Sequence, residues 1–325
     1  MGEVTNISWC HHTFNPWIGC TRVSPGCVNC YAEKLATSRM GVKWGPGAER
    51  RVTSPSYWQQ LQRWDRKAAK EGERRRVFVA SLADVFDKEA PEGQRARLWA
   101  EIDKCPHLDF MLLTKRPQNW REMLPVKWLF GEWPANIRLG FSAEDQARLV
   151  ERLSHARSLH DSYPRIPAMF VSYEPALGPL DLVGSWAFMD VDQVIAGGES
   201  GPNARPAHPE WFRDVRDECV IAGCAFFFKQ WGEWLPAGEI KPSLSPRSDL
   251  VNIRAHGLVH YDGKAELVAG PDDPDPEFGI TALDLDGNDG VACVYRVGKD
   301  YAGSTLDGEA WQQFPEDINP LERIA

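Results

Sequence analysis

The chain has 325 residues, of which 43% are hydrophobic and 26% charged, and its net charge is −9. This composition is typical of a globular protein with one large α/β domain or two smaller ones, and the negative charge argues against a general nucleic-acid coat. The sequence has no run near the ~18 apolar residues needed to span a bilayer and no secretory signal pattern, so we expect a cytoplasmic protein without a membrane segment.

Positive charge is concentrated in the N-terminal part of the chain. Residues 1–76 carry 13 Lys or Arg against 6 Asp or Glu, whereas the remainder has a net charge of −16. A basic stretch of this kind is suited to a polyanionic substrate. Residues 63–76 also have the composition of a solvated helix, so both interpretations stay open at this point.

Three cysteines form the strongest motif of the sequence. Cys20, Cys27 and Cys30 fall within eleven residues, in a loop that contains glycine and proline. Three thiolates at this spacing can bind one soft metal centre, and thiolates are the protein ligands of iron–sulfur clusters. Three protein ligands on a four-iron cluster leave one iron open to a small molecule. The motif therefore predicts a catalytic [4Fe–4S] cluster.

Structural zinc, in a non-catalytic nucleic-acid-binding module, is the alternative. Zinc normally takes four ligands, and no second Cys-x-x-Cys pair follows, but Cys10, His11 or His12 would complete a zinc site. A crowded cysteine group in a chain without a signal peptide indicates metal binding rather than disulfides. The scattered cysteines are expected to be small buried apolar residues. They are Cys10, Cys105, Cys219, Cys224 and Cys293.

Six short apolar runs follow the cysteine loop, and each precedes a stretch of helical character. They cover residues 77–81, 110–114, 137–141, 168–172, 193–197 and 224–228. Continuous rather than alternating apolar runs favour a parallel sheet buried on both faces, and the strand–helix alternation indicates repeated βαβ units. We therefore expect the α/β class, as a partial (β/α) barrel of about six parallel strands over residues 1–240, with the cysteine loop after the first strand.

Polar or charged residues follow these runs directly. Because the C-terminal ends of parallel strands face one common site, we expect these residues to converge. A cation at such a strand end, Lys115, would reach the carboxylate of a ligand as a point charge. The residues in question are Ser81, Asp84, Lys115, Arg116, Ser142, Glu144, Ser172, Glu174, Gly197, Gly198, Glu199 and Lys229.

The character of the chain changes after about residue 240. Turn signals and a dense acidic patch predict an irregular or β insertion over residues 241–295, and residues 296–325 are expected to pack back on the barrel. Together they form a small C-terminal appendage. Residues 284–290 faintly resemble a calcium loop, but Asp289 stands where the glycine is required and no glutamate closes the loop, so we discount it.

The motifs together resemble those of the phage Gp37/Gp68 family, also called the DUF5131 family, which is related to radical S-adenosylmethionine (SAM) proteins. The resemblance covers about residues 7–235 and about the last thirty. It is carried by residues 13–20, 26–32, 81–86, 113–117, 140–146, 174–179, 197–202, 228–232, 296–299 and 306–308. The usual radical SAM loop has three residues between its first two cysteines, whereas this loop has six.

The resemblance implies that Cys20, Cys27 and Cys30 hold the cluster, and that SAM is cleaved reductively to methionine and a 5′-deoxyadenosyl radical. A likeness to spore photoproduct lyase, a DNA-repair radical SAM enzyme, implies hydrogen bonds from Ser81 and Ser142 to SAM. The glutamates would accept from ribose hydroxyls, or alternatively form salt bridges at the barrel mouth. The other residues assigned to SAM are Tyr31, Asp84, Lys115, Glu144, Ser172, Glu174, Gly197, Gly198 and Glu199.

The same likeness and the basic N-terminal stretch favour a nucleic acid or nucleobase as the substrate, for repair or modification. Candidate contacts are Trp17, Arg22, Arg116, Arg205 and Lys229. The aromatic residues near the loop have an alternative interpretation, in which they pack the N-terminal segment across the barrel mouth. An electron donor and, through the family resemblance, a three-Cys-motif partner protein are the expected partners.

Overall fold

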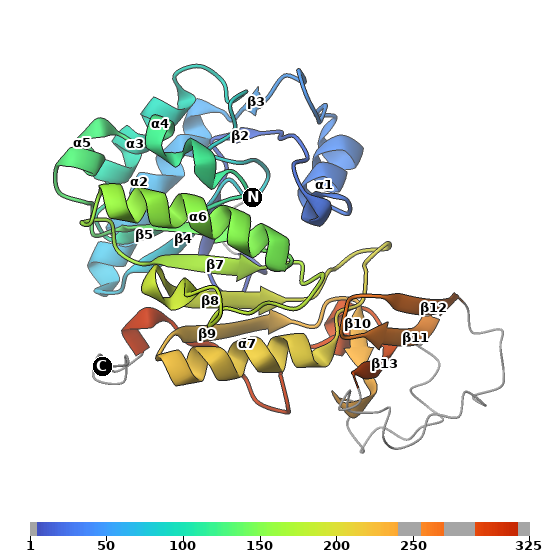
Figure 1. The fold of residues 1–325 in the computed structure, drawn as a ribbon. Coiled ribbons are helices and arrows are strands. Elements are labelled where there is room, and N and C mark those ends of the chain that lie inside the picture. The colour runs from blue at the N-terminus through green and yellow to red at the C-terminus, as the bar shows by residue number, and fades with distance from the viewer. Residues whose placement is uncertain (1–4, 240–254, 270–289, 318–325) are drawn as a thin grey trace. The chain divides into compact units, whose positions relative to one another are not determined.

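A computed structural model describes residues 5–239, 255–269 and 290–317 of the chain (Figure 1). The chain divides into two compact units, and each is described by itself. The first unit comprises residues 1–142, 150–172 and 189–191, and the second comprises residues 143–149, 173–188 and 192–325. Residues 1–240, which were expected to form one domain, are therefore divided between the two units.

Within the described residues, seven strands form one sheet in the order β1-β4-β5-β6-β7-β8-β9. The pairs β1–β4, β4–β5, β5–β6, β6–β7 and β8–β9 are all parallel. The bounds are β1 (His12–Phe14), β4 (Arg75–Val79), β5 (Leu108–Thr114), β6 (Ile137–Ser142), β7 (Met169–Tyr173), β8 (Val191–Gly197) and β9 (Ala225–Gln230). The expected α/β class with parallel strands is confirmed, and the cysteine loop follows β1, a strand that none of the six apolar runs predicted.

The six expected strands are present, and β1 is the additional one. All five residues of β7 are buried, as expected of a strand that is covered on both faces. The strand expected at residues 77–81 ends earlier, at Val79, because Ala80 adopts a left-handed conformation with φ of 64°. Ala80 donates its N–H to the carbonyl of Phe14, at 2.7 Å, so the turn after β4 is tied to the end of β1.

Helices alternate with the strands. Their bounds are α1 (Tyr31–Met40), α2 (Pro55–Glu71), α3 (Gln94–Asp103), α4 (Trp120–Met123), α5 (Val126–Phe130), α6 (Gln146–Ser162), α7 (Pro209–Ala222) and α8 (Lys299–Ala302). Single 3₁₀ turns are η1 (Pro25–Cys27), η2 (Pro117–Asn119), η3 (Ala187–Met189), η4 (Ala237–Glu239) and η7 (Pro315–Asp317). None of the helices in the described part of the chain has the length and apolarity needed to cross a bilayer.

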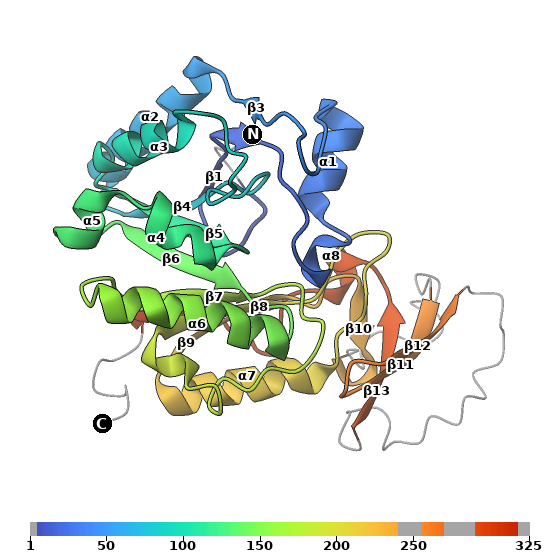
Figure 2. The same ribbon diagram turned by 45° about the horizontal axis from the view of Figure 1, so that its top comes forward.

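The basic helix of the N-terminal part is amphipathic. Ser54 caps α2 by accepting from the N–H of Tyr57, and Gly72 ends it in the left-handed conformation, as is common at helix termini. Its buried face packs against β4 and β5. Figures 1 and 2 show α3 alongside α2, and Gln62 donates to Glu101 across them at 3.1 Å. Much of the basic stretch is therefore a solvated helix face.

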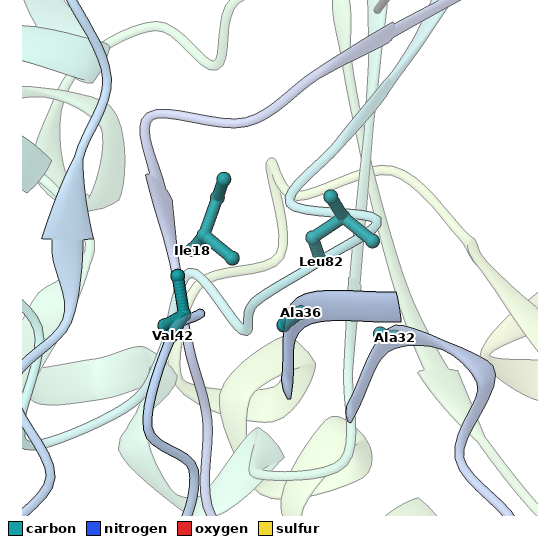
Figure 3. Close-up of a cluster of buried hydrophobic side chains, with 5 residues drawn as sticks. All are labelled: Ile18, Ala32, Ala36, Val42 and Leu82. Carbon is teal, nitrogen blue, oxygen red and sulfur yellow. The ribbon is translucent and has the colours of Figure 1, made fainter. Parts of the chain in front are cut away.

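A small apolar cluster fixes α1 on the first unit (Figure 3). It joins the short strand β2 (Trp17–Ile18), which pairs with β3 (Arg51–Val52), to α1 and to the turn after β4. Cys30 is among the partly buried residues packed against this cluster. The cluster therefore sets the position of the helix that begins directly after the third cysteine. Its members are Ile18, Ala32, Ala36, Val42 and Leu82.

The C-terminal part adds an antiparallel sheet in the order β10-β13-β11-β12. The bounds are β10 (Trp234–Pro236), β11 (Ala255–His260), β12 (Ala265–Ala269) and β13 (Val291–Arg296). β structure is thus present in the described part of residues 241–295, while the calcium-like stretch at 284–289 lies outside the described residues. Farther on, Trp311 accepts from the N–H of Phe228 at 2.8 Å, so this part of the C-terminal segment lies against β9.

The first prediction concerns His11, which joins β4 just before β1 begins. Its Nδ1 accepts from the N–H of Arg76 at 2.8 Å, so the folded state needs a neutral ring. Burial, followed by the charges of Arg76 and Arg75, lowers the pKa of His11 from 6.5 to about 4. Between these two values the unfolded chain binds a proton that the folded chain does not, so the stability that depends on His11 is lost as the pH falls from 6.5 to 4.

We expect His11→Asn to flatten this part of the stability profile, because Asn does not titrate. Urea unfolding of both proteins at pH 7.5, 6 and 5 measures it. The difference in unfolding free energy between the two proteins should change on acidification. A difference that stays constant over this range would contradict the assignment.

Candidate functional site

The cysteine loop begins at a constrained glycine. Gly19 has φ of +122°, and a Cβ at this position would lie 2.9 Å from the Arg50 side chain. Its N–H donates to the carbonyl of Leu82 at 3.0 Å, which ties the start of the loop to the turn after β4. The loop then passes through η1 and reaches Cys30, which directly precedes α1. Both ends of the loop are thus fixed by the first unit.

Cys20 is held through its backbone and its sulfur. Its carbonyl accepts from the N–H of Gly45 at 2.9 Å. Its Sγ accepts from the guanidinium of Arg116 at 3.4 Å, and the same guanidinium donates to the carbonyl of Thr21 at 2.7 Å. The loop is therefore bound at its first cysteine to the end of β5. Arg116, expected to contact substrate, instead contacts the cysteine loop.

Asp84 is the centre of the polar contacts behind this loop. Its carboxylate accepts from Arg116 at 2.8 Å, from Thr114 Oγ1 at 2.7 Å and from the N–H of Lys115 at 3.2 Å. It also accepts from the N–H of Phe86 at 2.9 Å. Asp84 and Arg116 are both buried. The carboxylate, expected to bind the cofactor, joins the turn after β4 to the end of β5.

The thiols differ from ordinary exposed cysteines in their acidity. Burial and then the Asp84 carboxylate raise the pKa of Cys20 to about 12, against the opposing charge of Arg116. Burial also raises the pKa of Cys30, which nearby backbone N–H groups and the Lys115 ammonium partly offset. Without a metal both thiols are therefore protonated at neutral pH. Metal ligation requires thiolates, so loading of the site would release protons.

Lys115 and Ser142 meet at the ends of β5 and β6. Lys115 Nζ donates to Ser142 Oγ at 2.9 Å, and the Ser142 carbonyl accepts from Arg152 at 2.7 Å. Ser142 is buried, and Lys115 lies close enough to Cys30 for its charge to favour the thiolate. The structure thus brings two of the expected SAM-binding residues together, and places one of them within electrostatic reach of the cysteine loop.

Ser81 is held by Asn15, a residue that no sequence motif singled out. Asn15, fully buried directly after β1, donates to Ser81 Oγ at 3.0 Å and accepts from the N–H of Leu82 at 2.7 Å. The Ser81 carbonyl accepts from the Tyr31 hydroxyl at 2.7 Å, while the Tyr31 side chain stays largely exposed. Asn15 follows a strand like the other candidates, so recognition of β1 would have identified it.

No three His, Cys, Asp or Glu side chains in the described ranges are grouped closely enough to hold a single metal ion. The residues considered as further zinc ligands have other environments. Cys10 is buried, His11 Nδ1 accepts from the N–H of Arg76, and the ring of His12 stacks on Trp64 at 4.3 Å.

All eight cysteines lie in the described part, and none forms a disulfide. The five scattered cysteines are buried, as expected.

Trp17 and Arg22, both expected to contact substrate, have different surroundings: the burial of Trp17 contradicts a stacking role, whereas the contact of Arg22 with substrate stays a prediction. Trp17 is completely buried, so it offers no exposed face for stacking; its ring belongs to the packing of the N-terminal segment. Arg22 is exposed, but its guanidinium forms two hydrogen bonds with Glu33, at 2.7 and 2.9 Å. Arg50, also in the basic segment, is buried in an ion pair with Asp87. Part of the positive charge of residues 1–76 is thus neutralised within the protein.

In the second unit, Glu174 pairs with Lys229. The Nζ of Lys229 lies 2.8 Å from Glu174 Oε1. Gly197 faces the same carboxylate, because a Cβ there would lie 2.7 Å from Oε1. A Cβ on Gly198 would lie 1.9 Å from the carbonyl oxygen of Trp231. The two glycines therefore allow close approach of protein groups, where close approach of a ligand was expected.

The remaining candidates are mostly buried. Glu199 is paired with Arg205 through contacts of 2.5 and 2.8 Å, which matches the salt-bridge alternative rather than two separate ligand contacts. Ser172 and Glu144 have almost no exposed surface. Contacts of these groups with SAM or substrate stay predictions.

Comparison with known proteins gives a family and several distant structures. A model of the family described as "Protein of unknown function (DUF5131)" matches residues 4–315. A peroxynitrite isomerase from Paenarthrobacter aurescens (strain TC1) is 30% identical over 92 residues, which make up 26% of this chain and 43% of that protein.

Among solved structures, spore photoproduct lyase complexed with dinucleoside spore photoproduct has a TM-score of 0.41 at 13% identity, and the match covers 61% of this chain and 58% of that one. A mutant of spore photoproduct lyase with bound AdoMet and dinucleoside spore photoproduct has a TM-score of 0.43 at 12% identity, with 84% and 72% covered. The chain thus spans less than two thirds of the curated relative and of the first of these structures.

The second prediction tests the packing of Gly197 on Glu174. Gly197→Ala would force the carboxylate to move away from Lys229, and we expect it to destabilise the protein by about 1–3 kcal/mol, as overpacking does. Urea unfolding measures this cost. Gly178→Ala is the matched control, because its Cβ would make only an ordinary contact, 3.6 Å from Asp145.

A mutant cycle identifies the source of that cost. In a Glu174→Ala background the clashing carboxylate is gone, so Gly197→Ala should become nearly neutral, since neighbouring sites are not additive. The same cost in both backgrounds would show that Glu174 is not what Gly197 accommodates.

Proposed function

We propose a function for this chain, which belongs to the DUF5131 family, from the geometry of its cysteine loop: it is a radical SAM-type enzyme. The cysteine loop would hold a [4Fe–4S] cluster, and SAM would bind beside it. The observation that carries the proposal is the meeting of the loop with two adjacent cations at the end of β5. Arg116 contacts the sulfur of Cys20, and Lys115 lies within electrostatic reach of Cys30 while it binds Ser142.

The donor set fits an iron–sulfur cluster. Cys20, Cys27 and Cys30 are partly exposed thiols in one loop, whereas the other five cysteines are buried. Iron–sulfur clusters take thiolate ligands. Each ligand of a four-iron cluster binds a different iron, so the thiolates are spaced more widely than around one ion. A loop without a compact single-ion group is compatible with this arrangement, and it gives the zinc alternative no support among the described residues.

The residues beside the loop fit the polar ends of SAM. Lys115 would pair with the carboxylate of SAM, and Ser142 and Ser81 would hydrogen-bond its polar groups. When bound, the cluster would supply the electron that breaks the S–C5′ bond of SAM, giving methionine and a 5′-deoxyadenosyl radical. Glu174 and Glu199 stay candidate partners for the ribose hydroxyls, in competition with their ion pairs to Lys229 and Arg205.

Residues of this chain orient the proposed ligand groups before the cluster and SAM bind. Asp84 holds Arg116 against Cys20, so the first ligand is oriented before the metal binds. The buried Ser142 fixes the ammonium of Lys115, which reduces the freedom that this side chain would lose on pairing with a carboxylate. Deprotonation of Cys20 and Cys30 would accompany loading. These roles are binding, orientation and proton release.

We also propose a nucleic acid or nucleobase as the substrate. The support is the excess of Lys and Arg in residues 1–76 and the exposed ring of Tyr31 next to Cys30, because aromatic faces stack on unpaired bases. Arg22, Arg116 and Lys229 are engaged in contacts within the protein.

Reductive cleavage of SAM consumes an electron, so the proposed enzyme requires an electron donor. A three-Cys-motif partner protein remains a proposed partner.

The third prediction tests the cluster. After anaerobic reconstitution with iron and sulfide, the wild-type chain should carry roughly four iron atoms. Cys20→Ala, Cys27→Ala and Cys30→Ala should each lose most of this iron, because a thiolate ligand is missing. Cys219→Ala, in the buried part of α7, is the matched control and should load normally. Stoichiometric zinc with no iron in the wild-type protein would reject the proposal in favour of the zinc module.

The fourth prediction tests the role of Lys115. Lys115→Met should weaken SAM binding to the reconstituted protein by about tenfold or more, because a hydrogen bond to a charged group contributes about 1.5–3 kcal/mol. Equilibrium dialysis measures the dissociation constant. Lys34→Met removes an exposed charge from α1 and should leave it unchanged. An unchanged affinity in Lys115→Met, with normal iron content, would remove Lys115 from the SAM site.

A further inference from the structure

We propose that Arg116 is a positioning residue for the cluster: it fixes the sulfur of Cys20 and, by donating to it, raises the reduction potential of the bound cluster. This inference rests on the proposed function. It gives Arg116 a role different from the substrate contact that the sequence suggested. The two adjacent cations at the end of β5 then have separate tasks, since Lys115 is directed to Ser142 and Arg116 to the loop.

The contacts of Arg116 use the planar shape of its guanidinium. One terminal nitrogen reaches both Cys20 Sγ, at 3.4 Å, and Asp84, at 2.8 Å, while the other donates to the carbonyl of Thr21 at 2.7 Å. One rigid guanidinium, with its two terminal nitrogens arranged as a fork, thus binds the Cys20 sulfur, the Asp84 carboxylate and the Thr21 carbonyl. Lysine has a single flexible ammonium and does not reproduce this geometry. The side chain is 7% exposed, so water competes little for these bonds.

The charges require a cation at this point. The Asp84 carboxylate and the Cys20 sulfur are bound by the same terminal nitrogen of Arg116, and a cluster ligand must be a thiolate. Arg116 bonds to both groups and offsets the repulsion between two buried negative charges. Its own position is secured by Asp84, which receives three further hydrogen bonds, one from Phe86 in the turn after β4 and two from Thr114 and Lys115 at the end of β5.

A hydrogen-bond donor on a ligand sulfur raises the reduction potential of an iron–sulfur cluster. Reduction adds negative charge to an iron–sulfur cluster, and hydrogen bonds to the sulfurs are among the factors that set its potential. A buried guanidinium on Cys20 stabilises the reduced form more than the oxidised form. Loss of this contact should therefore lower the midpoint potential. Arg22 provides a contrast, because it is exposed and paired with Glu33, so water screens its charge.

The experiment measures midpoint potentials of reconstituted proteins in the absence of SAM, by anaerobic redox titration followed through visible absorption and electron paramagnetic resonance. Arg116→Met should shift the reduction equilibrium at least tenfold toward the oxidised cluster, which is about 59 mV for one electron. Arg116→Lys, which keeps the charge but not the fork, should fall between Met and wild type. Arg22→Met is the matched charge-deletion control, and we expect a smaller shift.

The outcomes separate this inference from the proposed function. If the wild type loads iron but Arg116→Met, with full iron content, has an unchanged potential, the inference is overturned while the cluster assignment stands. An equal shift in Arg22→Met also overturns it, because the effect would then be general charge. If Arg116→Met fails to fold, as judged by circular dichroism, a wild-type potential in Arg116→Lys overturns the role of the fork. If the wild type binds no iron, both proposals fall.

Discussion

The buried ion pair between Asp84 and Arg116 is the interaction on which the site depends. A lone carboxylate in this position would be costly, and breaking such a pair destabilises a protein by about 3–5 kcal/mol. Here the carboxylate accepts from backbone and side-chain donors in the turn after β4 and at the end of β5, and the guanidinium also binds the cysteine loop. The polar network therefore connects the sheet to the sulfur of Cys20 and to the carbonyl of Thr21.

A second constraint acts on the other end of the loop and is apolar. The small side chains Ala32 and Ala36 let α1 approach Ile18 and Leu82 closely (Figure 3). Cys30 precedes this helix, so its place follows from the packing of α1. The loop is consequently held by an electrostatic contact at the first cysteine and by hydrophobic burial at the third, and these two forces differ in their response to salt and temperature.

The sequence was sufficient to predict the six strands, because they depend on local apolar patterns, and the buried state of the scattered cysteines, because a free cysteine behaves as a small apolar residue. The strand β1 was missed since three residues, two of them His12 and Thr13, give no continuous apolar run. The contact of Arg116 with Cys20 joins positions 96 residues apart, and no local pattern encodes it. Trp17 was misjudged because an aromatic ring beside a loop packs inward or outward according to tertiary contacts alone.

The two glycines at the end of β8, Gly197 and Gly198, should differ in how they vary among members of the family. At Gly197 the obstacle is the side chain of Glu174, so a relative that lacks this glutamate is free to carry a larger residue there. The two positions should covary across an alignment. At Gly198 the obstacle is a main-chain oxygen, that of Trp231, which no exchange of side chain removes. That glycine should be invariant wherever the strand retains its path.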